Sequence, residues 1–110
     1  MSFEEIEEKR RELSKTHNCV VQTIVLDAPE GDKVVGFLKE PKRIDKMQAL
    51  DISIRSLTQA AAHIVTTSFL KDESDPRFMD EKPENDPIYL GLLLAVQSKI
   101  SVYTEAIKKN

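Results

Sequence analysis

The chain has 110 residues, which is enough for one compact domain and too few for an enzyme built from several domains. Hydrophobic residues make up 40% and charged residues 32% of it, proportions that are typical of a globular protein and exclude the composition of a disordered one. The formal net charge is −3, so the total charge does not favour broad contact with nucleic acid or with an anionic membrane. We therefore expect a single domain over residues 1–110.

Residues that would support redox, metal or export functions are scarce. Cys19 is the only cysteine, which excludes an intramolecular disulfide and a site of several thiolates. The N-terminus is acidic, unlike a signal peptide, and the longest apolar run is far below the roughly 20 residues that span a bilayer. The three glycines fit no nucleophile elbow, phosphate loop or dinucleotide fingerprint. We expect a cytoplasmic protein that is not an enzyme, has no cofactor or metal and does not contact a membrane.

A helix is predicted over residues 1–16, followed by a hairpin over 19–39. Ser2 and Glu5 fit a capping box, and acidic residues precede basic ones along the segment, as the helix dipole favours. Two runs rich in β-branched residues then flank a loop with Pro and Gly, which indicates antiparallel strands. Because two strands alone are marginal in water, the hairpin should pack one face on helices or gain strands from a partner chain.

A helical segment is predicted over residues 41–70. Apolar residues at helical spacing follow Pro41, and Ser56 to Gln59 has the pattern of a second capping box. This pattern allows two helices or one long bent helix. The apolar stripe of the first part is Ile44, Met47, Leu50 and Ile54.

An acidic loop is predicted over residues 71–87, where seven acids minus three bases give −4, with Phe78 and Met79 as its anchors. Asp86 as N-cap and Pro87 at the next position predict a last helix over residues 87–109. The fold class is therefore α+β: an N-terminal helix, a two-stranded antiparallel hairpin, and a bundle of two to three helices.

The last helix carries an apolar seam with spacings of 4, 3, 4, 3 and 4 residues, a heptad pattern that lets helices pack along their length. The seam has two interpretations: it fills the chain's own core, or it forms a groove for self-association or for a client protein. Replacing two of its residues with Asp separates them, because only the second leaves a folded monomer. The seam, and hypothetical partner-binding site, consists of Tyr89, Leu93, Val96, Ile100, Tyr103 and Ile107.

Four cations surround the start of the 41–70 segment, and three of them lie where positive charge opposes the helix dipole. They are solvated surface residues, or they meet an acidic patch on a partner or in the chain's own 71–87 loop. Nucleic acid is a less favoured partner because interleaved aromatic residues are missing. The four residues of this charged patch are Lys39, Lys42, Arg43 and Lys46.

The order of these elements resembles a family of small phage tail assembly chaperones. The resemblance rests on the acidic-then-basic first helix, the Val-rich hairpin, the segment of residues 35–43 with its Lys39, Pro41 and Arg43, a helix ending at Phe69 and Leu70, the acidic loop and the closing helix. The chain departs from the pattern at Phe69, where many relatives have tryptophan, and its acidic loop is longer.

The resemblance implies a protein of the host cytoplasm that forms homo-oligomers and coats the helical tape measure protein while the tail tube polymerises around it. An amphipathic domain with a spare apolar helix face suits that task. Two alternatives are a structural virion protein, such as a head–tail or tail completion protein, and a small nucleic-acid-binding regulator.

Overall fold

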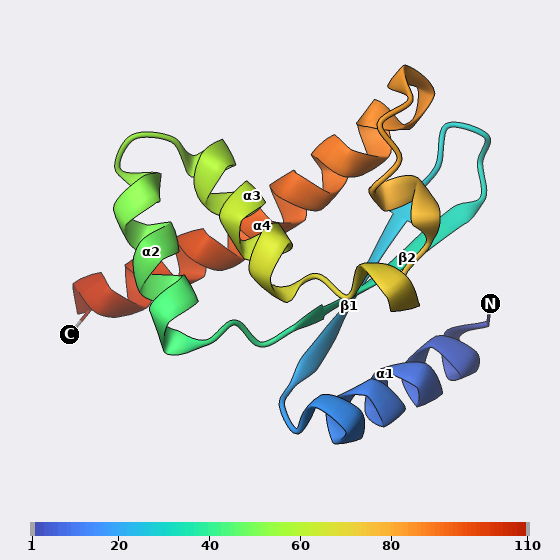
Figure 1. Ribbon diagram of the computed structural model, residues 1–110, viewed down its shortest axis with the longest axis horizontal. Helices are drawn as coiled ribbons and strands as arrows, with labels where there is room; N and C mark the ends of the chain where they lie inside the picture. The colour runs from blue at the N-terminus through green and yellow to red at the C-terminus, as the bar shows by residue number, and fades with distance from the viewer. Residues whose placement is uncertain (1, 110) are drawn as a thin grey trace.

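The computed structural model describes the backbone of residues 2–109 and the side chains of residues 2–102, and it confirms the predicted α+β fold class (Figure 1). Three short 3-10 helices (η1–η3) lie between the last two α-helices. In chain order the elements are α1 (Phe3–His17), β1 (Val21–Asp27), β2 (Lys33–Lys39), α2 (Arg43–Ser53), α3 (Leu57–Ser68), η1 (Lys71–Glu73), η2 (Pro76–Phe78), η3 (Pro83–Asn85) and α4 (Asp86–Lys109).

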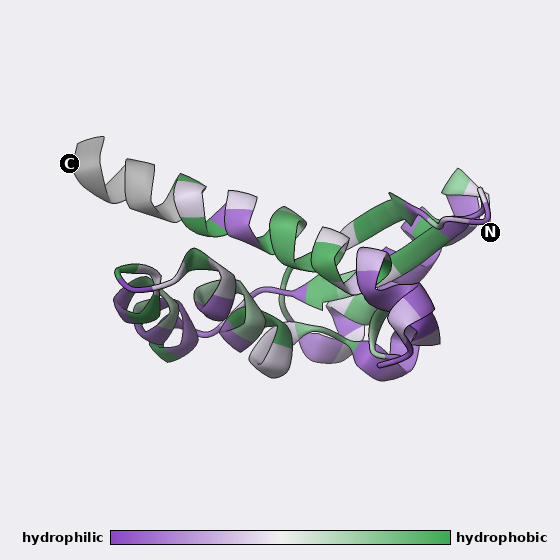
Figure 2. Cartoon of the chain, turned by 90° about the horizontal axis from the view of Figure 1, so that it is seen from above, coloured by the Kyte–Doolittle hydropathy of each residue, from purple (hydrophilic) through white to green (hydrophobic). Residues whose placement is uncertain are grey.

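The β1–β2 hairpin separates two groups of helices. β1 and β2 are antiparallel, with Ile24 opposite Gly36. On one face, α1 covers a small cluster of Leu13, Val21 and Phe37. The opposite face packs on α3 and α4, which lie away from α1 in Figures 1 and 2. The hairpin thus obtains from helices on both faces the burial that two isolated strands lack.

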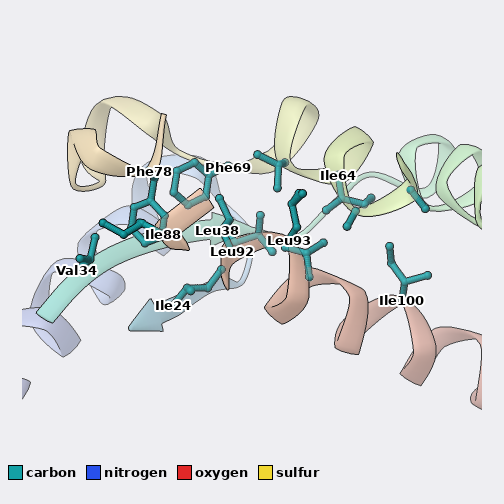
Figure 3. Close-up of a cluster of buried hydrophobic side chains, with 14 of the residues drawn as sticks. Ile24, Val34, Leu38, Ile64, Phe69, Phe78, Ile88, Leu92, Leu93 and Ile100 are labelled. Carbon is teal, nitrogen blue, oxygen red and sulfur yellow. The ribbon is translucent and has the colours of Figure 1, made fainter. Parts of the chain in front are cut away.

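The larger core lies between the hairpin, α3, α4 and the segment after α3 (Figure 3). Phe69 and Phe78 meet there edge to face, with ring centroids 5.2 Å apart and planes at 65°. Gly36 lies beneath both rings, and a Cβ at this position would be 2.8 Å from Cε1 of Phe69. The absence of a side chain at Gly36 therefore lets the two rings close over the sheet.

The local signals for helix starts are confirmed. At α1, the Glu5 amide donates to Ser2 Oγ and the Ser2 amide donates to Glu5 Oε1, both at 3.2 Å. At α3, the Gln59 amide donates to Ser56 Oγ at 3.2 Å. Ser56 itself has extended dihedral angles, so the 41–70 segment is two helices rather than one bent helix.

The 71–87 segment, which was predicted as a loop, is attached to the rest of the fold by a buried side chain and by hydrogen bonds. Phe78 is fully buried, and the amides of Leu70 and Asp75 donate to carbonyls on the outer edge of β2 at 2.9 and 3.0 Å. The predicted N-cap at the end of the segment is wrong. Asp86 already has helical dihedral angles, φ −56° and ψ −41°, and is the first residue of α4.

Arg77 ties this segment to the hairpin loop. Its Nη2 donates to Asp32 Oδ2 at 2.8 Å and to Asp75 Oδ2 at 2.9 Å. These hydrogen bonds favour the ionised carboxylates and lower the pKa of both Asp32 and Asp75 below the usual aspartate value. A folded-state pKa below the unfolded one gives stability that is present at neutral pH and is lost as the pH falls through the folded pKa.

We therefore expect Arg77→Gln to destabilise the chain at neutral pH and to have little effect well below the usual aspartate pKa of about 3.9. Urea unfolding midpoints of both chains across this range measure the difference. Lys42→Gln is the control, because no ion pair joins Lys42 within the described part of the chain. A destabilisation by Arg77→Gln that stays constant with pH would contradict the account.

Candidate protein-binding surface

The described part of the α4 seam lies inside the chain's own core. Leu93, Val96 and Ile100 are buried, and Figure 3 shows Leu93 and Ile100 on the side of α4 that faces α3 and Ile64. Because α3 and the hairpin already cover these three side chains, they pack in the chain's own core. This is the first of the two interpretations of the seam, and it replaces the hypothesis that the three side chains bind a partner. The side chains of Tyr103 and Ile107 lie outside the described residues.

Tyr89 is the half-buried member of the seam. It packs against the core and borders a hollow of about 430 Å³ with Phe78 and Met79, rimmed by Asp80, Glu81 and Asp86. The residues of this acidic rim belong to the 71–87 segment. The hollow therefore lies beside the N-terminal end of α4.

The four cations of the predicted patch have different environments. Lys46 Nζ lies 2.9 Å from Glu40 Oε1, and Lys39 is half-buried at the end of β2. Lys42 and Arg43 are exposed at the start of α2, where no side chain caps the helix. Within the described residues these two cations form no ion pair, so the unfavourable contact with the helix dipole, about 0.3–1 kcal/mol each, is offset only in part, by Asp45 in the first turn.

The part of the charged patch at the start of α2 lies far from the end of the acidic segment that precedes α4. The long axis measures 40 Å, and Figure 1 places α2 at one end of it and the turn before α4 at the other. Arg77 contacts carboxylates of its own segment and of the hairpin loop, and Glu73 contacts Lys9. The two opposed charges are therefore available to different neighbours.

The apolar stripe predicted for α2 faces solvent at three of its four positions. Ile44, Met47 and Ile54 are 54, 55 and 85% exposed. Residue Ala49 is buried on the opposite side, and the helix packs there on Ala60 and Ala61 of α3. The small alanines allow α2 and α3 to approach closely. Leu50 and Ile52 pack against the same core, whereas Ile44 and Met47 are left outside.

The apolar stripe of α2 is visible in the sequence, but which side of the helix is buried was not predicted. The available signal was the pairing of Ala49 with the alanines of α3, since small residues mark the closest approach of two helices. We call the exposed side of this helix the α2 face. It consists of Ile44 and Met47, of Ile54 directly after the helix, and of the exposed cations Lys42, Arg43 and Arg55 at the two ends of the helix.

A second exposed apolar area lies on the outer side of α4, where Leu90 and Leu94 are exposed. Figure 2 shows the N-terminal half of α4 as hydrophobic over most of its surface. No cation accompanies these two residues in this half of the helix. The α2 face therefore differs from the outer side of α4 by combining apolar side chains with unpaired positive charge.

Other site classes find little support in the described part of the chain. No group of three or more His, Cys, Asp or Glu side chains there could hold a metal ion. None of the helices described combines the length and the hydropathy that crossing a membrane requires. A comparison with protein-family models, with curated proteins and with solved structures finds no match to this chain.

Proposed function

We propose that the protein is a non-enzymatic tail assembly chaperone of a phage, which holds the helical tape measure protein through the α2 face. The observation that carries the proposal is the exposure of Ile44, Met47 and Ile54 on one side of a helix. The element order that resembles the chaperone family supports the same conclusion. An exposed apolar stripe is the feature with which a protein covers an apolar helix of a client.

The size of the apolar area suits transient binding. Fully burying an Ile or Met side chain contributes about 1.5–3 kcal/mol, and these three are already partly buried in the free protein. Three such contacts, reduced by the entropy lost on association, give a modest affinity at each site. A chaperone that must leave when the tube closes around its client requires such an affinity.

The cations of the α2 face indicate the chemistry of the client helix. Lys42, Arg43 and Arg55 are exposed, against the single exposed acid of α2, Asp51. An amphipathic client helix with acidic residues beside its apolar stripe would remove the repulsion at the start of α2. We therefore propose an acidic amphipathic segment of the tape measure protein as the bound element.

The double substitution Met47→Glu and Ile54→Glu tests this proposal. We expect the variant to fold, because both side chains are exposed and Glu is a good helix former. On co-expression with the tape measure protein, copurification should fall by at least about tenfold, the loss expected when apolar contacts worth about 1.4 kcal/mol or more are removed. Leu94→Glu on the outer side of α4 is the matched control. Unchanged copurification by the double variant would refute this use of the α2 face.

The fate of the protein distinguishes the chaperone from a structural virion protein. A chaperone that is displaced during assembly should be absent from purified particles or present only in traces. Quantitative mass spectrometry of the particles measures this. Stoichiometric amounts would support the structural alternative instead.

A further inference from the structure

The outer edge of β1 presents backbone groups that have no hydrogen-bond partner within residues 2–102. The amide and carbonyl of Phe37 bond away from β1, to Ser74 Oγ at 3.0 Å and the Leu70 amide at 2.9 Å. Alternate residues of an antiparallel strand point to opposite edges, so Gly36 faces β1 and pairs there with Ile24. It follows that the residues on either side of Ile24 direct their amides and carbonyls outward.

α1 occupies one end of this outer edge. The Val21 amide donates to Ser14 Oγ at 3.1 Å, and the Val21 carbonyl accepts from Arg10 Nη1 at 3.4 Å. Beyond this point, the outward backbone groups of Thr23, Val25 and Asp27 have no hydrogen-bond partner among the described residues. Three alternate residues therefore form an unpaired, continuous edge.

Apart from Asp27 at its end, the edge lacks the features with which proteins block strand addition. From Val21 to Leu26 the strand has no proline and no charged residue, and its seven residues pair with β2 without a bulge. Val25, whose backbone groups point to the open edge, is an apolar residue that is 48% exposed. Edges of this kind add a further strand unless charge, proline or a covering segment prevents it. On β2 the segment after α3 provides that cover, whereas β1 has none beyond Val21.

We propose that the β1 edges of two copies of this chain pair antiparallel about a twofold axis at Val25, which joins the two hairpins into one four-stranded sheet. In this register Val25 lies opposite Val25 of the second copy, and Thr23 lies opposite Asp27. All three outward residues are then opposed to outward residues, and each opposed pair exchanges both of its hydrogen bonds. Moving the twofold axis by one residue either way shifts the pairing by two residues, which leaves an end position unpaired or meets α1 at Val21.

Charge also favours a second copy as the added strand. In the proposed register Asp27 of one copy lies opposite Thr23 of the other, beside Val21, where Arg10 already reaches the edge. The twofold axis repeats this approach of Arg10 and Asp27 on the other side. Asp27 is paired with Lys33 within its own hairpin and Arg10 with Glu7 within α1, so the contact brings two existing ion pairs together. This self-pairing is independent of the α2 face, which lies on a different element.

Introducing a charged side chain at Val25 tests the pairing and its register. The wild-type chain should show a concentration-dependent monomer–dimer equilibrium in sedimentation, and Val25→Lys and Val25→Glu should each shift its midpoint to at least about tenfold higher concentration, since like charges face each other across the axis. An equimolar mixture of the two variants should recover the dimer as a heterodimer. Ile54→Lys, at another exposed apolar residue, is the control and should dimerise like the wild type.

Hydrogen exchange gives a second readout that does not depend on a variant. The amides of Thr23 and Val25 should exchange more slowly as the protein concentration rises, whereas those of Gln22 and Ile24, already paired with β2, should not change. A wild-type chain that stays monomeric at millimolar concentration would overturn the proposal and leave the edge to a strand of another protein. A dimer that Val25→Lys leaves intact, or a mixture of Lys and Glu variants that stays monomeric, would overturn it as well.

Discussion

Val96→Asp should unfold the chain rather than release a folded monomer from an assembly. Val96 is fully buried between α4 and the rest of the core. A carboxylate there would lose its hydration without gaining a partner, and such a substitution costs more than about 4 kcal/mol. Since domains of this size have a total stability of about 5–15 kcal/mol, this one change removes a large part of it and is enough to unfold a chain at the lower end of that range. Urea unfolding followed by circular dichroism measures the loss.

Leu94→Asp is the matched control for Val96→Asp. It introduces the same side chain on the same helix, two residues away, at a position that is 65% exposed. Its effect should stay near 0.5 kcal/mol, the range of about ±0.5 kcal/mol typical of surface substitutions. A folded, monomeric Val96→Asp variant would contradict core packing and return the buried part of the seam to the status of an interface.

The second large effect is expected for Phe78→Ala. Phe78 is fully buried although it belongs to a short 3-10 helix in an acidic segment. Its ring contacts Phe69 edge to face and lies over Gly36. Replacing a buried Phe by Ala costs about 3–5 kcal/mol, through lost transfer free energy and the cavity that remains. The thermal midpoint of unfolding should therefore fall steeply.

The neighbouring residue is the control for Phe78→Ala. Met79 follows directly and is 36% exposed, so Met79→Ala should cost less than half as much. The two variants should also differ in proteolysis, because only loss of Phe78 frees the segment from the hairpin. Equal effects of the two substitutions would show that the segment is not anchored through the aromatic pair.

The elements that could be predicted are those whose signals are local. Ser2 with Glu5 and Ser56 with Gln59 specify helix starts through hydrogen bonds that span three residues. The hairpin follows from two β-branched runs and a loop with Pro and Gly between them. The choice between two helices and one bent helix was open in the sequence, and the extended dihedral angles of Ser56 resolve it.

Features that depend on contacts between distant residues were not predictable in the same way. Which side of α2 is buried depends on how closely the alanines of α3 approach Ala49, and no periodicity within α2 contains that information. The order of the acidic segment likewise depends on Arg77 reaching the hairpin loop and on Phe78 reaching Phe69. The heptad spacing of α4 located an apolar side correctly but did not determine whether a partner or the core covers it.

The four cations of the predicted charged patch have different environments, and only part of the patch is available to a partner. Lys46 is paired with Glu40, whereas Lys42 and Arg43 lie beside the exposed apolar residues of α2. The combination of both features on the α2 face was not predictable until the orientation of that helix was known.

Photo-crosslinking from the α2 face tests the central claim most directly. A photoreactive amino acid is placed at Met47 in one variant and at Leu94 in another, and each is irradiated after co-expression with the tape measure protein. The account predicts a covalent adduct with that protein from position 47 and far less from position 94. An adduct from position 94 with none from position 47 would contradict the assignment of the α2 face as the client-binding surface.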